Sequence, residues 1–145
     1  MRIIVIAGAV LAAGAAYAEE PGFLFDALRL PKYHMAWDRL VKDVEPTPDW
    51  LRNFTKNLEG AAGEVKTVTI DGKPFKLSYV CKPEDCDGHK FEVLFEENGA
   101  RAVGALGGKD ETPAFYGSPS QAEQDALTKA IHPVASAETP QPKSE

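Results

Sequence analysis

The sequence predicts an α+β domain in which an antiparallel β-sheet is covered by helices. Two observations lead to this prediction. Apolar residues recur at helical spacing before Lys56 and again after residue 120, whereas between these segments they alternate with polar residues at the period of two that is typical of strands. The turn signals Asp71-Gly72 and Asn98-Gly99 separate strand-like runs, so neighbouring strands are expected to run antiparallel.

The first part of the chain is expected to be helical. Residues Phe23 to Leu30 are predicted to form a short apolar helix or an entry segment. Pro31 suits the first position of the next helix, because the N–H that proline lacks would be unpaired there. Thr47 is expected to cap a further helix that has Pro48 in its first turn. The inward-facing residues predicted for these two helices are Tyr33, Trp37, Leu40 and Val41, and then Trp50, Leu51 and Phe54.

Four strands are expected between Glu64 and Leu106, because the apolar period changes to two at Glu64. The residues that mark these strands are Val68 and Ile70, then Phe75, Leu77, Tyr79 and Cys81, then Phe91, Val93 and Phe95, and finally Ala100 to Leu106. The first three sets each repeat at every second position, so each is predicted to share one face of its strand. The segment that begins at Cys81 is therefore expected to form a hairpin tip.

The last element is expected to be a helix that begins near Ser118-Pro119-Ser120-Gln121, which has the form of a capping box. Its predicted apolar stripe consists of Ala122, Ala126, Leu127, Ala130 and Ile131. His132-Pro133 should end this helix, because proline cannot continue it. Residues 133–145 are rich in Pro, Ser, Ala and Glu and contain no aromatic residue, so a disordered tail is predicted.

The amino-terminal residues have the pattern of an export signal. Arg2 supplies the positive charge, Ile3 to Ala13 form the apolar run, and Ala16-Tyr17-Ala18 is a small-x-small cleavage site. The apolar run is shorter than the roughly 20 residues that a membrane span needs. The prediction is a signal peptide over residues 1–18 that is cleaved after Ala18, a single domain over residues 19–132, and a soluble mature protein in the bacterial periplasm.

The composition is acidic, with a formal net charge of −6 at pH 7 over 145 residues. Nucleic acids and anionic membranes would repel such a chain, so neither is expected as a partner. Basic proteins would be attracted to it. An alternative reading is that the acidity only keeps the exported protein soluble.

The two cysteines, Cys81 and Cys86, are separated by four intervening residues. Export to an oxidising compartment favours a disulfide, which would remove roughly 2 kcal/mol of unfolded-state freedom and stiffen the loop locally. A metal site is the alternative, in which the two thiolates would join acidic side chains and His89. The other candidate ligands for such a site are Glu84, Asp85 and Asp87.

Signatures of catalysis are scarce in the chain. The cysteine spacing differs from the two-residue spacing of dithiol redox motifs. The three histidines, His34, His89 and His132, are scattered and have no nucleophile motif beside them. The expectation is a protein that is not an enzyme and that needs no cofactor and no metal.

Three motifs match those of a known family: Trp50-Leu51-Arg52 ahead of a strand, Val68-Thr69-Ile70-Asp71-Gly72, and above all the Cys81-Lys82-Pro83-x-Asp85-Cys86 loop. Through these motifs, and over roughly Phe23 to Ile131, the chain resembles the family of inhibitors of vertebrate lysozyme. The resemblance implies a periplasmic homodimer with helices on both faces of the sheet, an α/β/α sandwich. It also implies a disulfide-closed loop that protrudes and plugs the active-site cleft of C-type lysozyme.

The resemblance further implies which residues contact the partner: Lys82, Pro83, Glu84 and Asp85. The family has a histidine at the position of Glu84, where it is inserted between the two catalytic carboxyl groups of lysozyme. A third carboxylate there would be repelled, although Lys82 or a protonated lysozyme acid would offset the repulsion. The alternative function is a scaffold that no longer recognises C-type lysozyme and binds another envelope protein or muramidase.

Overall fold

The computed structural model describes residues 20–133. The predicted signal peptide with its cleavage site, and residues 134–145 of the predicted tail, therefore lie outside the described residues. The described chain contains four helices and six strands. In chain order they are α1 (Leu24–Ala27), α2 (Pro31–Lys42), α3 (Asp49–Asn57), β1 (Ala61–Ala62), β2 (Lys66–Ile70), β3 (Lys73–Lys82), β4 (Asp85–Glu96), β5 (Ala102–Gly107), β6 (Ala114–Tyr116) and α4 (Gln121–Ile131).

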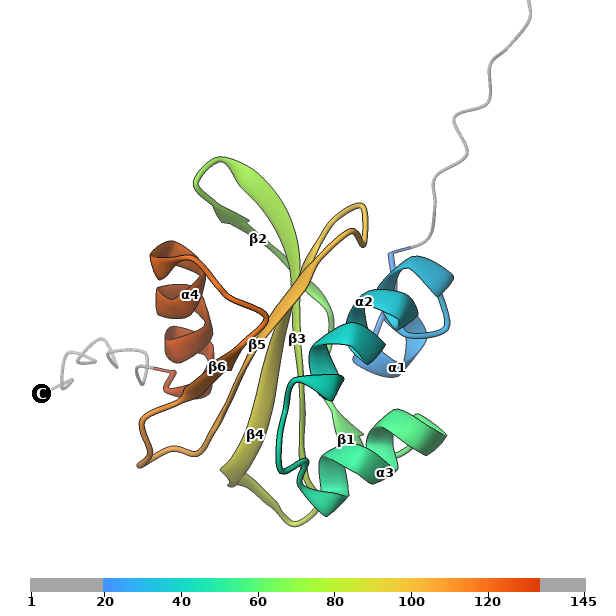
Figure 1. Cartoon of the computed structure of the whole chain (residues 1–145), viewed down its shortest axis with the longest axis vertical. Coiled ribbons are helices and arrows are strands. Elements are labelled where there is room, and N and C mark those ends of the chain that lie inside the picture. Colours follow the sequence, from blue (N-terminus) through green and yellow to red (C-terminus); the bar gives the residue numbers. More distant parts are fainter. Residues whose placement is uncertain (1–19, 134–145) are drawn as a thin grey trace, which may run out of the picture.

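The six strands form one sheet in the order β1-β3-β4-β5-β6, and β2 also pairs with β3 (Figure 1). Every pairing is antiparallel. Along one edge of β3, β2 occupies the first half and β1 the end of the strand, while β4 lies along the other edge. The predicted α+β class and antiparallel sheet are therefore confirmed.

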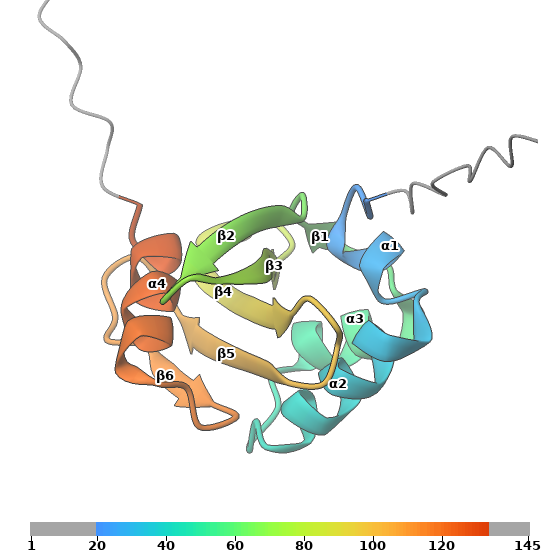
Figure 2. The ribbon, with the colours of Figure 1, turned by 90° about the horizontal axis from the view of Figure 1, so that it is seen from above.

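The alternation along β4 divides the core into two clusters. Phe91, Val93 and Phe95 pack in a large cluster with α1, α2 and α3, whose central residue is the fully buried Trp37. Leu94 belongs to a second cluster with residues of α4. Successive residues of a strand point to opposite faces of the sheet. Figure 2 accordingly shows α4 on one side of the sheet and α1 to α3 on the other.

Two local predictions hold in the structure. Asp71 and Gly72, between β2 and β3, both have positive φ angles of 50° and 76°, as a tight two-residue hairpin turn requires. Pro31 occupies the first turn of α2, and the four core residues predicted for this helix are all buried. The turn residues and the helical spacing therefore identified these elements correctly.

The predicted cap of α3 is wrong. Pro48, not Thr47, is the residue that precedes the helix, and it supplies no side-chain hydrogen bond. The Thr47 hydroxyl instead donates to the carbonyl oxygen of Val44 at 2.7 Å, which closes the preceding turn. Threonine side chains commonly bond to nearby backbone in this way, and here that contact replaces the cap.

The predicted start of α4 is two residues too early. The capping box is made by Ser120 and Glu123, and Ser118 lies outside the helix with a φ of 57°. Glu123 also accepts hydrogen bonds from the Arg101 guanidinium at 2.8 and 2.9 Å. Arg101 directly precedes β5, and its contact with Glu123 favours the capping box that begins at Ser120 over the one that begins at Ser118.

Candidate functional site: the β3–β4 hairpin tip

The hairpin between β3 and β4 reverses direction at Pro83 and Glu84, and its last strand pair is Lys82 with Asp85. All four of these residues are exposed. Glu84 has a φ of 67°, the left-handed conformation that few non-glycine residues adopt. The tip lies at the same end of the sheet as the start of α3 (Figure 1).

Cys81 and Cys86 form a disulfide, with 4.8 Å between their Cα atoms. The predicted bridge is confirmed, and it leaves no thiolate for the metal alternative. Cys81 is only 3% exposed and pairs with Ala61 of β1, so its backbone is fixed in the sheet. The disulfide therefore ties the exposed turn directly to a buried strand.

A register shift next to the disulfide creates a bulge in β4. Cys81 pairs with Lys90, whereas its neighbour Lys82 pairs with Asp85, so residues 86–89 have no partner on β3. Bulges of this kind bend a strand locally and re-aim its side chains. The residues that follow Cys86 therefore depart from the regular strand pairing and form one side of the tip.

Asp85 stabilises this bulge from within. Its Oδ1 accepts a hydrogen bond from the Gly88 N–H at 3.2 Å, and its Oδ2 accepts one from His89 Nδ1 at 2.7 Å. The hydrogen bond from His89 lowers the pKa of Asp85. Desolvation opposes this shift, while the charge of His89, the Gly88 N–H and the charge of Lys82 lower the pKa further. A side chain at Gly88 would place its Cβ 2.5 Å from Asp85 Oδ1, so glycine suits this position. We call these three residues the Asp85 clasp.

The clasp separates the four predicted contact residues into two groups. The Asp85 side chain already has two partners within the loop, whereas the side chains of Lys82 and Glu84 make no hydrogen bond or ion pair with any residue between 20 and 133. Pro83 restricts the turn through its fixed φ angle. Lys82 and Glu84 are thus the charged groups of the tip that remain available to another molecule.

Two different surfaces flank the tip. On the α3 side lies a groove of about 550 Å³, lined by Trp50, Lys82, Pro83 and His89 among others. On the other side, the loop between β5 and β6 is attached through the Lys109 N–H, which donates to the Asp87 carbonyl at 2.8 Å. The exposed carboxylates on that side are Asp85, Asp87, Asp110 and Glu111. The tip therefore presents an acidic flank and a partly aromatic flank.

The remaining histidines lie away from the tip. His34 of α2 bonds to the Leu28 carbonyl oxygen at 3.0 Å, and His132 at the end of α4 bonds to the Gly108 carbonyl oxygen at 2.8 Å. Each is thus engaged locally with backbone. Between residues 20 and 133, no three side chains of the metal-binding types gather in one place, and no helix is long and apolar enough to cross a membrane.

The sequence did not reveal the clasp or the environment of Glu92. Asp85 and His89 were recognised only as possible metal ligands, because the bulge that brings them together has no sequence period. Glu92 is 3% exposed although it is charged. Its position between the core residues Phe91 and Val93 gave no signal, because a charged residue there fits the alternation of a strand with one solvated face.

Comparison with known proteins identifies relatives of this chain. No protein-family model matches it. A Pseudomonas aeruginosa protein named inhibitor of vertebrate lysozyme is 26% identical in an alignment 141 residues long, and the alignment covers 88% of this chain and 90% of the relative. An uncharacterised protein of the same species is 32% identical over 72 residues, or 50% of this chain and 44% of the relative. An uncharacterised Yersinia pestis protein is 25% identical over 96 residues, or 66% and 60% of the two chains.

Proposed function

Because the chain belongs to the family of inhibitors of vertebrate lysozyme, we propose that it is a periplasmic inhibitor of C-type lysozyme that occludes the enzyme's active-site cleft with its β3–β4 tip. The relative that covers nearly the whole chain is named as an inhibitor, and this chain is accordingly not an enzyme. Occlusion requires no turnover and no cofactor. The observation that carries the proposal is the exposed, disulfide-closed tip with the Lys-Pro-Glu-Asp sequence.

The tip is held in one shape before any partner arrives. The Cys81–Cys86 disulfide and the Asp85 clasp fix its two sides, and Pro83 restricts the turn between them. A loop that is already ordered loses little conformational entropy on binding, so more of its contact energy becomes affinity. This preorganisation supports a rigid plug.

The charges of the tip give Lys82 and Glu84 different roles in the proposed complex. Lys82 would supply the positive charge that attracts the two catalytic carboxyl groups of the enzyme. Glu84 would be tolerated when the lysozyme acid of raised pKa is protonated and donates a hydrogen bond to it. The acidic flank, with Asp87, Asp110 and Glu111, would steer the chain toward a basic enzyme.

Three further features of the proposal come from the family resemblance. The helices on both faces of the sheet are supported by the two apolar clusters, one with α1 to α3 and the other with α4. The periplasmic location rests on the predicted signal peptide, and pairing into a homodimer rests on the resemblance alone. Sedimentation of the mature chain at micromolar concentration tests the dimer, and fractionation of the native cells tests the location.

The test of the proposed function is the lysis of bacterial cell walls by lysozyme, followed as a loss of turbidity. The oxidised chain is expected to slow lysis by a C-type lysozyme in proportion to its concentration. Lysozymes of other types serve as controls in parallel assays. Full lytic activity of the C-type enzyme in the presence of a large excess of the chain would contradict the proposal.

A further inference from the structure

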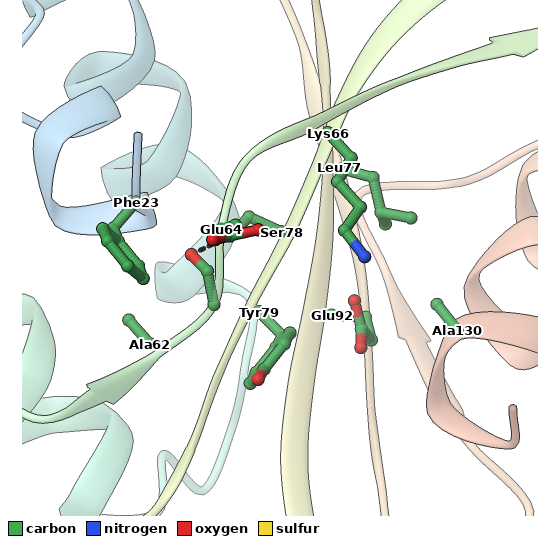
Figure 3. A pocket seen from close by; sticks show the side chains of 10 residues that line it. Phe23, Ala62, Glu64, Lys66, Leu77, Ser78, Tyr79, Glu92 and Ala130 are labelled. Atoms are coloured by element: carbon green, nitrogen blue, oxygen red, sulfur yellow. Dashed lines mark hydrogen bonds between the residues drawn. The ribbon is translucent and has the colours of Figure 1, made fainter. Parts of the chain in front are cut away.

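A second pocket, remote from the tip, opens on the face of the sheet between α1 and α4 (Figure 3). Its volume is about 380 Å³, within the range of small-molecule sites. Leu77 and Tyr79 of β3 form much of its lining, Phe23 stands at one end, and Ala130 of α4 stands at the other. The phenyl ring of Phe23 is exposed although it is large and apolar, with 40% of the residue in contact with solvent.

The carboxyl group of Glu92 lies at the centre of this pocket and is only partly compensated. The residue is 3% exposed, and its carboxylate forms a loose ion pair with Lys90 of the same strand. The nearest ammonium group, Lys90 Nζ, is 3.8 Å from Oε1, which is beyond hydrogen-bond distance. No buried side-chain oxygen or nitrogen among residues 20–133 lacks a hydrogen-bond partner, so the Glu92 oxygens are not sealed inside the protein but face the pocket.

The charges around Glu92 favour one kind of ligand. Lys66 of β2 directs its amino group toward the Glu92 carboxylate (Figure 3). Lys90 lies on β4, as Glu92 does. Tyr79 from β3 and Ala130 from α4 bring no charge, and the only other carboxylate that lines the pocket, Glu64, is exposed. Once Glu92 is protonated, the interior of the pocket therefore carries positive charge.

We propose that this pocket binds a small carboxylate with an apolar body, whose carboxylate contacts Lys66 and Glu92 and whose apolar part lies along Leu77, Tyr79 and Phe23. The ligand carboxylate accepts hydrogen bonds from the Lys66 ammonium and from the Glu92 hydroxyl. An amine would instead face two lysine ammonium groups. The site is independent of the lysozyme contact, because it involves neither the tip nor the disulfide.

Burial gives this site a pH dependence that can be measured. Desolvation raises the pKa of Glu92 to about 7, although Lys90 and Lys66 oppose the shift. If only the protonated form binds, the competent fraction is about 0.9 at pH 6 and about 0.1 at pH 8. The dissociation constant should therefore be about tenfold lower at pH 6 than at pH 8. A ligand carboxyl group remains ionised over this range.

The experiment titrates the full mature chain with octanoate and observes the amide and aromatic NMR signals of Tyr79 and Phe23. The expected result is a shift of these signals and a roughly tenfold tighter dissociation constant at pH 6 than at pH 8. Octylamine and octyl sulfate are titrated in parallel. Equal octanoate affinity at both pH values, tighter binding of octylamine, or no shift at pH 6 would overturn the proposal. Tighter binding of octyl sulfate would also contradict a site built around a carboxylate.

Three variants distinguish the site from a general apolar surface. Glu92→Gln keeps the shape and a hydrogen-bond donor, so its octanoate affinity should be independent of pH and close to the pH 6 value. Lys66→Gln should weaken binding roughly tenfold, as expected for one charge-assisted hydrogen bond. Lys56→Gln, an exposed change on α3, should have no effect. A Glu92→Gln chain that keeps the tenfold pH dependence, or a Lys66→Gln chain that binds as the native chain does, would refute the assignment.

Discussion

Replacing Glu84 with histidine should tighten binding to C-type lysozyme, because it removes a carboxylate that faces the two catalytic carboxyl groups in the proposed complex. Glu84 is exposed and has no partner within the described residues, so the folded state loses no contact. Its φ of 67° is also compatible with the change, since histidine is among the residues enriched in the left-handed region. The variant should therefore fold with nearly unchanged stability.

The magnitude follows from the charge that is removed. Two like charges about 4 Å apart repel by about 1 kcal/mol in water and by about 4 kcal/mol at the dielectric of a protein surface. Loss of this repulsion corresponds to a gain between about fivefold and about a thousandfold in affinity. Any protonated fraction of the new imidazole adds attraction to the same carboxyl groups.

The assay is a calorimetric titration of C-type lysozyme at pH 7, together with the cell-wall lysis assay. Glu111→His serves as the matched control, because it makes the same change of charge on the acidic flank and leaves the turn unaltered. The control should change affinity by much less, and its effect should weaken as salt screens the exposed charges. Unchanged or weaker binding of Glu84→His at pH 7, with the control behaving as expected, would refute the docking of Glu84 beside the catalytic acids.

Three other predictions concern the tip and the buried acid. The double change Cys81→Ser and Cys86→Ser should lower the free energy of unfolding by about 2 kcal/mol, measured by urea titration. It should weaken inhibition by a larger factor than this loss of stability would explain. Equal inhibition by reduced and oxidised chains would argue against a rigid plug. His89→Ala should loosen the tip and weaken inhibition while the melting temperature stays nearly constant. Because the pKa of Asp85 is lowered in the folded chain, the contribution of the Asp85 carboxylate to the native clasp should be lost only when acid protonates Asp85. A chain that inhibits as well without His89 would show that the clasp has no role. Glu92 binds its proton more tightly in the folded state, with a pKa of about 7 instead of 4.5. The ionised carboxylate should therefore lower the free energy of unfolding by about 3 kcal/mol above pH 7, and the protonated one by nothing below pH 4. Glu92→Gln should stabilise the chain at pH 8 in thermal unfolding, and no gain there would contradict the buried, charged carboxylate.

Much of the fold could be predicted because its central elements have long and regular patterns. The alternation of Phe91, Val93 and Phe95 identified β4 and the face that it buries. The two-residue strand β1 and the three-residue strand β6 were not predicted, since neither is long enough to show a period. Their positions depend on pairing with β3 and β5, which is information that the local sequence lacks.

The start of α4 was predicted wrongly because two possible capping sequences lie two residues apart. Ser118 and Ser120 each begin a possible capping box, and the contact of Arg101 with Glu123 supports the second one. The disulfide was predictable from export and spacing, whereas the Asp85 clasp depends on a register shift that only the folded hairpin reveals. Burial of Glu92 could not be predicted either, because the pattern gives its face of the sheet and not the extent to which α4 covers it.

Competition for the lysozyme cleft tests occlusion most directly. The measurement is the affinity of the oxidised chain for C-type lysozyme, by calorimetry, with and without an oligosaccharide inhibitor that fills the active-site cleft. If the tip enters the cleft, the apparent dissociation constant should rise in proportion to the fraction of enzyme that holds the oligosaccharide. An affinity that stays constant when the cleft is saturated would show that the chain binds elsewhere on the enzyme.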